Sequence, residues 1–131
     1  MKRALLPAGI LAATAALGSA ATAHHSFAVF FDETRTVEIE GTVTAFRFTN
    51  PHGTIAVDVV GANGEVEHWR VETTAPVVLQ RRGWSRSSIR AGDKVRVSGW
   101  PARDGAPYMR LQNAEHQDGT QIGQGFGLRD D

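Results

Sequence analysis

Period-two alternation of side chains is the feature that most constrains the fold of this chain. From Val37 to Val43 every second residue is apolar or glycine, and the residues between them are glutamates and threonines. This pattern predicts a strand with one buried face. Phe46 and Phe48 fall on the opposite phase, so we expect a one-residue bulge near Ala45 that returns both rings to the core.

The next two strands are predicted by the same alternation and by the turns around them. Residues 50–53, Asn-Pro-His-Gly, interrupt the first strand with turn residues. Residues 55–59 resume the alternation, and an Asn-Gly hairpin signal at residues 63–64 leads into a third strand over residues 65–73. The three strands therefore form a meander.

A short helix and two more strands are expected after the meander. Thr74 can cap a helix over residues 76–82, with proline in its first turn and Gly83 at its end. Alternation returns over residues 94–100 and 109–114. This order predicts an all-β fold, a small five-stranded barrel like the OB-fold with the helix between strands three and four. An open sandwich or an SH3-like barrel is the rival architecture.

The barrel domain is predicted to span residues 24–117. From Asp118 onward glycines recur with few apolar residues, so residues 118–131 are expected to form a disordered tail. Trp100 lies on the polar phase of the fourth strand and is expected to mark a partner surface. The fold alone does not decide the function, because barrels of this kind carry sites of many types.

The first 23 residues have the pattern of a signal peptide. Lys2 and Arg3 precede an apolar stretch from Leu5 to Leu17 that is too short to span a bilayer. Cleavage is predicted after Ala23, although small residues also permit cleavage after Ala20 or Ala21. We therefore expect a soluble periplasmic protein if the source is Gram-negative. The sequence has no cysteine, so no disulfide stabilises it there.

Cleavage after Ala23 would place His24 and His25 at the start of the mature chain. A free α-amino group beside two imidazoles is a good ligand set for Cu(II), the tightest-binding first-row divalent ion at such a site. His52 lies in the turn between the first two strands, and the N-terminal segment is able to fold back toward it. The predicted metal site therefore comprises His24, His25 and His52, with copper as the candidate ion.

Two further residues are candidates for orienting a metal-binding imidazole. Glu72 ends the third strand and can accept a hydrogen bond from a histidine ring, and His68 lies on the same strand face. The alternative interpretation is simpler. His24 and His25 would merely follow the leader, His52 would cap its own turn, and His68 would belong to a solvated face with cross-strand ion pairs. His116 is expected to be exposed in the polar tail.

Other function classes are less well supported by the sequence. Four arginines at positions 81, 82, 86 and 90 and several aromatic residues suggest nucleic-acid binding on a barrel of this kind. Predicted export, 14 acidic against 12 basic side chains once Lys2 and Arg3 are removed with the leader, and the need for the aromatics in a small core argue against it. The sequence shows neither a nucleophile in a catalytic context nor a phosphate-binding loop, so no enzymatic activity is expected. The one enzymatic alternative is oxidation chemistry at a histidine-brace copper site.

Several motifs together resemble a known family. They are His24-His25-Ser26-Phe27, Asn50-Pro51-His52, Trp69 with Glu72, Arg82-Gly83-Trp84 and Gly92-Asp93. From His24 to about Asn113 the chain resembles the exported bacterial domain of unknown function 6152. The resemblance implies a small periplasmic barrel without an established activity, and it implies that the two histidine motifs matter together.

The sequence thus predicts a small exported protein that binds Cu(II) or a similar transition metal through its mature N-terminal histidines. The alternative is a metal-free periplasmic module that binds another protein through a barrel face or the edge at Trp100. Neither nucleic acid nor insertion into a membrane after removal of the leader is expected.

Overall fold

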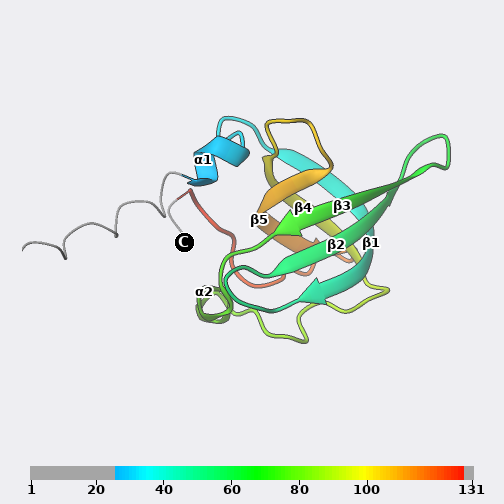
Figure 1. The fold of residues 1–131 in the computed structure, drawn as a ribbon. Helices are drawn as coiled ribbons and strands as arrows, with labels where there is room; N and C mark the ends of the chain where they lie inside the picture. Colours follow the sequence, from blue (N-terminus) through cyan, green and yellow to red (C-terminus); the bar gives the residue numbers. More distant parts are fainter. Residues whose placement is uncertain (1–25, 129–131) are drawn as a thin grey trace, which may run out of the picture.

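The computed structural model describes residues 26–128, in which five strands close into a barrel in the order β1-β2-β3-β5-β4 (Figure 1). The predicted leader, His24 and His25 lie outside the described residues. The elements are α1 Ser26–Phe30, β1 Val37–Arg47, β2 Thr54–Val60, β3 Val66–Glu72, α2 Pro76–Arg81, β4 Lys94–Pro101 and β5 Tyr108–His116. This strand order, with α2 between β3 and β4, is that of the OB-fold, so the predicted fold class is confirmed.

β1 bends around the barrel and pairs with two neighbours. Its first half pairs with β4 and its second half with β2, and the β1–β2 register shifts between Val43 and Ala45. The predicted bulge is therefore confirmed, and it turns Phe48 into the core while Phe46 packs against it. Gly41 lies where β1 crosses β2 so closely that a β-carbon would collide with the carbonyl oxygen of Asp58.

The barrel interior is filled by aliphatic side chains from all five strands. Leu79 of α2, Trp84 and Ile89 close one end of it. The strand residues buried inside are Ile39, Val43, Ile55, Val57, Val71, Val95, Val97, Met109, Leu111 and Ala114. Burial of this apolar surface is the main source of stability for a domain without disulfides.

A second register shift lies where β4 pairs with β5. Ser98 pairs with Asn113 and Gly99 with Leu111, so Gln112 is the additional residue on β5. The shift buries both Leu111 and Ala114 and exposes Asn113. Simple alternation over residues 109–114 is therefore interrupted, as it is in β1.

The predicted helix cap at Thr74 is wrong. Ala75 is the N-cap residue, and no side chain caps the helix. Thr74 is instead buried, and its carbonyl oxygen accepts hydrogen bonds from the amide of Gly53 and from the hydroxyl of Thr73. The predicted end of the helix is close to the observed one, because Gly83 has φ of 82° just after α2.

The predicted exposure of Trp100 is also wrong, because α1 covers it. The ring of Phe27 meets that of Trp100 edge-on at 5.6 Å, and the ring of Phe31 meets that of Tyr108 at 4.9 Å. These four aromatics form a small apolar layer outside the barrel, under α1.

No helix within residues 26–128 has the length and apolar character needed to cross a membrane.

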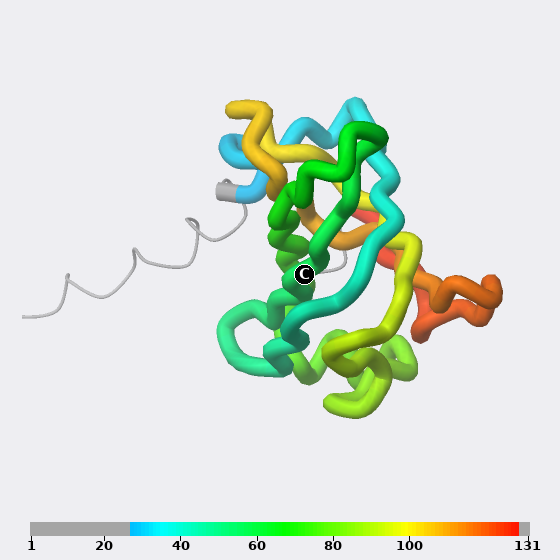
Figure 2. Tube along the Cα trace, turned by 90° about the vertical axis from the view of Figure 1, so that its right-hand side faces the viewer, coloured from blue at the N-terminus to red at the C-terminus, as the bar shows by residue number. Residues whose placement is uncertain are grey.

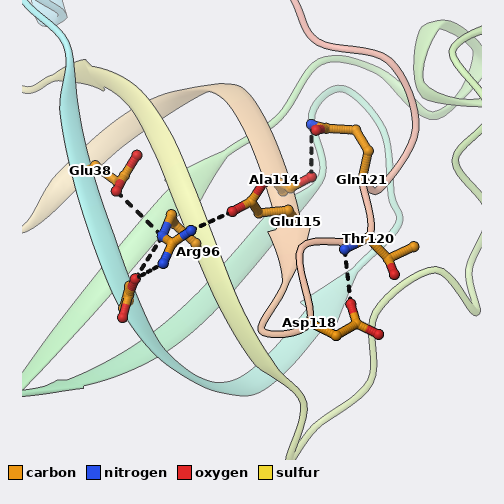
Figure 3. Close-up of polar contacts among 8 residues, drawn as sticks. Glu38, Arg96, Ala114, Glu115, Asp118, Thr120 and Gln121 are labelled. Atoms are coloured by element: carbon orange, nitrogen blue, oxygen red, sulfur yellow. Dashed lines mark hydrogen bonds and ion pairs between the residues drawn. The ribbon is translucent and has the colours of Figure 1, made fainter.

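The C-terminal segment packs on the barrel, so the predicted disorder is wrong for residues 118–128. Ile122 is buried, and its amide donates to the carbonyl of Ala114 at 2.9 Å. The side-chain amide of Gln121 donates to the same carbonyl at 3.2 Å, and the amide of Thr120 donates to Asp118 in the turn (Figure 3). Figure 2 shows this turn projecting from the barrel before the chain returns to it.

We expect the substitution Ile122→Ala to lower the free energy of unfolding by about 2–4 kcal/mol, because it leaves a cavity in the core. The matched control is Leu128→Ala, which truncates an exposed side chain of the same segment and should change stability by less than about 0.5 kcal/mol. Urea denaturation measures both values. Equal effects of the two substitutions would show that the segment does not contribute to the core.

Candidate functional site

Glu72 is the centre of a polar cluster on the outer surface of the barrel. Its Oε1 lies 2.9 Å from Nδ1 of His52 and accepts a hydrogen bond of 3.1 Å from Nη1 of Arg110. Its Oε2 accepts a hydrogen bond from the hydroxyl of Tyr108. Three donors, one from the loop between β1 and β2 and two from β5, therefore occupy the carboxylate, and it is fixed in position.

The loop between β1 and β2 brings His52 to this carboxylate. The amide of Gly53 donates to the carbonyl of Thr74 at 3.3 Å, and the amide of Thr73 donates to the carbonyl of Gly53 at 2.9 Å. A β-carbon on Gly53 would lie 2.6 Å from the hydroxyl of Thr73. Glycine is thus needed for the loop to approach the end of β3. The preceding Asn50–Pro51 peptide bond is cis.

The contact with Glu72 determines which nitrogen of His52 remains available. A carboxylate only accepts hydrogen bonds, so Nδ1 of the ring carries the hydrogen in this contact. In the neutral ring, Nε2 then holds the free lone pair. The side chain of His52 is 46% exposed, so Nε2 is accessible to a ligand. A carboxylate on the other ring nitrogen is the usual partner of a metal-binding histidine.

Arg110 carries a charge that is almost fully buried. Its side chain is 6% exposed, and besides Glu72 it donates to the carbonyl of Thr73 at 3.0 Å. The ring of Phe27 covers its guanidinium at 5.4 Å. A buried charge requires a close partner of opposite sign, so Glu72 cannot move away from Arg110 without a large cost in free energy.

Tyr108 completes the cluster and keeps its proton. Its pKa is raised, first by burial of the ring and then by the hydrogen bond to Glu72 and the negative charge of that carboxylate. The guanidinium of Arg70 stacks on the ring at 3.9 Å, and Phe31 packs against its edge. The hydroxyl therefore serves as a hydrogen-bond donor to Glu72 at neutral pH.

α1 is fixed on the same side of the barrel as His52. Arg103, in the loop between β4 and β5, donates from Nε to the carbonyl of Ala28 at 2.7 Å and from its amide to that of Phe30 at 2.9 Å. Phe27 of α1 covers Arg110, and Arg110 binds the same oxygen of Glu72 as His52 does. The start of the described chain is thus close to the cluster.

The structure brings together two of the predicted site residues and separates a third. His52 and Glu72 are in contact, whereas His24 and His25 are outside the described residues. His68 is 77% exposed and pairs with Asp58 at 2.6 Å across β2 and β3, which agrees with a cross-strand pair. Within residues 26–128 no three histidine, aspartate or glutamate side chains form a group able to hold a metal.

His116, expected to be exposed, is half-buried at the end of β5. Its amide donates to the carbonyl of Thr120 at 2.9 Å, and its own carbonyl accepts from Gly119. This histidine therefore belongs to the turn that leads into the C-terminal segment. Its backbone contacts belong to that turn and not to the polar cluster around Glu72.

Two residues of the cluster were missed from the sequence. Arg110 and Tyr108 look like ordinary polar positions of an alternating strand. They reach Glu72 because β3 and β5 pair in parallel, with Arg70 opposite Tyr108 and Glu72 opposite Arg110. The barrel topology would have predicted this neighbourhood if the exact register of the last strand had been known.

The fold and the motifs define the chain as a small OB-fold barrel of one particular family. The family model described as "Family of unknown function (DUF6152)" matches residues 12–109. The chain belongs to this family, as its histidine motifs suggested. None of the curated proteins matches it in sequence.

Solved structures with a similar fold share little sequence with this chain. The mitochondrial single-stranded DNA-binding protein Rim1 of S. cerevisiae is 9% identical, with 71% of this chain and 98% of Rim1 covered and a TM-score of 0.50. A small single-stranded DNA-binding protein of Streptomyces coelicolor is 17% identical, with 63% and 91% covered and a TM-score of 0.42. A ZRD-deleted mutant of TiaS in complex with agmatine is 16% identical, with 73% and 23% covered and a TM-score of 0.42. The likeness to Rim1 supports the fold alone.

The titration of Tyr108 tests the geometry of the cluster. Tyr108 is the one tyrosine of the sequence, so tyrosinate absorbance reports it alone. We expect its titration midpoint to lie above the ordinary value of 10.0, and Glu72→Gln to lower the midpoint only in part, because burial is the largest cause of the raised pKa. As pH rises, the unfolded chain loses the Tyr108 proton at a lower pH than the folded chain does. The free energy of unfolding should therefore fall as pH rises above about 10. A midpoint at or below the ordinary value would contradict the cluster.

Proposed function

We propose that this protein is a small exported metal-binding protein, and that it holds Cu(II) or a similar late transition ion through His24, His25 and His52. The observation that carries the proposal is the contact of His52 with Glu72, which leaves the exposed Nε2 of the ring free. Both histidine motifs of the family resemblance then contribute to one site. Export to the periplasm is part of the proposal, because only removal of the leader frees the amine of His24.

α1 is connected to His52 through a chain of side-chain contacts. Phe27 of α1 contacts Arg110, Arg110 contacts Glu72, and Glu72 contacts His52. Three peptide units separate His24 from Phe27, and three residues span at most about 10 Å when extended. We propose that the amine and rings of the mature N-terminus reach the exposed edge of His52.

The donor set favours copper over harder ions. An amine and neutral imidazoles are nitrogen ligands, and affinity for such ligands rises along the first-row divalent ions to a maximum at Cu(II). Glu72 already accepts three hydrogen bonds, so its role is to orient His52 and not to bind the ion. We propose binding or delivery of the ion and not enzymatic turnover, since so small a barrel offers little surface for a substrate.

A metal-free module that binds another protein is the second candidate. Trp100 no longer supports it, since α1 covers that ring. The observation in its favour is the outer face of α1, where Val29 and Phe30 are both exposed beside the polar cluster. Apolar side chains exposed side by side are typical of a recognition surface. Such a module would bind its partner with or without copper.

Copper titration of the exported protein distinguishes the two candidates. N-terminal sequencing first establishes that the chain begins at His24. Isothermal titration should then show stoichiometric binding, which His52→Ala and His24→Ala each weaken and which rises with pH because the ligands release protons. His116→Ala is the matched control and should leave the affinity unchanged. Absence of binding near neutral pH, or binding that survives loss of both His24 and His52, would exclude the metal site.

The role of Glu72 has its own test. Glu72→Gln keeps the shape of the side chain but weakens its hold on the His52 ring, so we expect copper affinity to fall about 10–100-fold. Asp58→Asn changes the equivalent carboxylate beside His68 and should leave the affinity unchanged. Circular dichroism checks that both variants remain folded, since Arg110 loses its charged partner in the first. Equal affinities of the two folded variants would show that Glu72 does not orient a metal ligand.

A further inference from the structure

Charge is distributed unevenly between the two ends of the barrel. Residues 41–57 and 73–92 contain no aspartate or glutamate, yet they contain five arginines. These stretches include the loop between β1 and β2, helix α2 and the segment from residue 82 to residue 92. All three lie at the same end of the barrel, the lower end in Figure 1. Figure 2 shows the segment after α2 as a lobe at that end.

Four of these arginines are exposed, and within the described residues no ion pair joins their guanidinium groups to a carboxylate, although the backbone amide of Arg90 donates to Asp93 at 2.9 Å. We call them the arginine end: Arg47, Arg81, Arg86 and Arg90. Arg96 shows the contrast, because on β4 it pairs with Glu38, Glu40 and Glu115 (Figure 3). The arginine end is therefore the part of the described surface where several positive charges remain free for an external partner.

The backbone that carries these arginines is firmly anchored. Three of the arginines each lie within two residues of a buried apolar side chain. The pairs are Arg81 with Leu79, Arg86 with Trp84, and Arg90 with Ile89. The guanidinium of Arg86 also lies over the ring of Phe48 at 5.5 Å. Such anchoring lowers the conformational entropy that the backbone of this segment loses on binding.

We propose that the arginine end docks the protein on an anionic phospholipid surface. A guanidinium matches the geometry of a phosphate, and juxtamembrane clusters of basic residues are attracted to anionic lipid headgroups. Val77 on α2 is 52% exposed and lies one helical turn before Arg81. An apolar side chain beside the charges is able to enter the boundary between headgroups and acyl chains.

Two observations favour a lipid surface over a single-stranded nucleic acid. Binding of single strands needs exposed aromatic rings for base stacking, whereas Phe48 and Trp84 at this end are buried. The β2–β3 hairpin, beside the face on which OB-folds bind oligonucleotides, carries Asp58 and Glu67 on its opposite faces and Glu65 in its turn. These carboxylates would repel a phosphate backbone.

Vesicle co-sedimentation tests the proposal. The exported protein is mixed with vesicles of phosphatidylglycerol and phosphatidylcholine in equal parts, or of phosphatidylcholine alone. We expect binding to the anionic vesicles only, and loss of binding near 1 M salt, where charges are screened beyond about 3 Å. Each of Arg81→Gln and Arg86→Gln should weaken binding by roughly fivefold, and the double variant by roughly 25-fold.

Control variants distinguish binding through the arginine end from an effect of the protein's net charge. Arg35→Gln removes one exposed positive charge from the turn before β1, at the other end of the barrel, and should change binding by less than about twofold. The predicted leader would bind lipid by itself, so all variants are compared after export on the same background. A single-stranded oligonucleotide is the competing probe. Equal effects of Arg35→Gln and Arg86→Gln, absence of binding to anionic vesicles, or binding of the oligonucleotide alone would overturn the proposal.

Discussion

The ion pair between Arg110 and Glu72 is the interaction on which the surface cluster depends. Arg110 is buried under α1, so its charge holds the carboxylate of Glu72 in one place. The pair also joins β3 to β5 along the short parallel seam that closes the barrel. The pair therefore supports both the β3–β5 seam and the orientation of His52, because Glu72 lies at the end of β3.

The parts of the fold that depend on local pattern were predictable from the sequence. The phase change at Phe46 and Phe48 predicted the bulge of β1, and the Asn-Gly hairpin signal lies at the turn between β2 and β3. Pro76 and Gly83 marked the limits of α2 to within one residue. In the site, the role of Glu72 as acceptor for a histidine ring followed from its place at a strand end, where a loop is close.

The remaining features depend on contacts between distant segments. Trp100 has the pattern of an exposed residue and is covered by a helix of five residues. The segment after residue 117 has few apolar side chains, and it is held by the buried Ile122 together with backbone hydrogen bonds to β5, which composition does not reveal. Arg110 became a partner of Glu72 only through the register of two strands that lie 38 residues apart. No local pattern carries that information.

The strand that closes the barrel is the last of the five in the chain. β5 lies between β3 and β4, and the segment around Ile122 packs on it afterwards. A chain that has emerged only as far as α2 is thus limited to an open meander with an unprotected apolar face. Cooperative closure has to await the final strand, which favours folding after synthesis over stepwise folding during it.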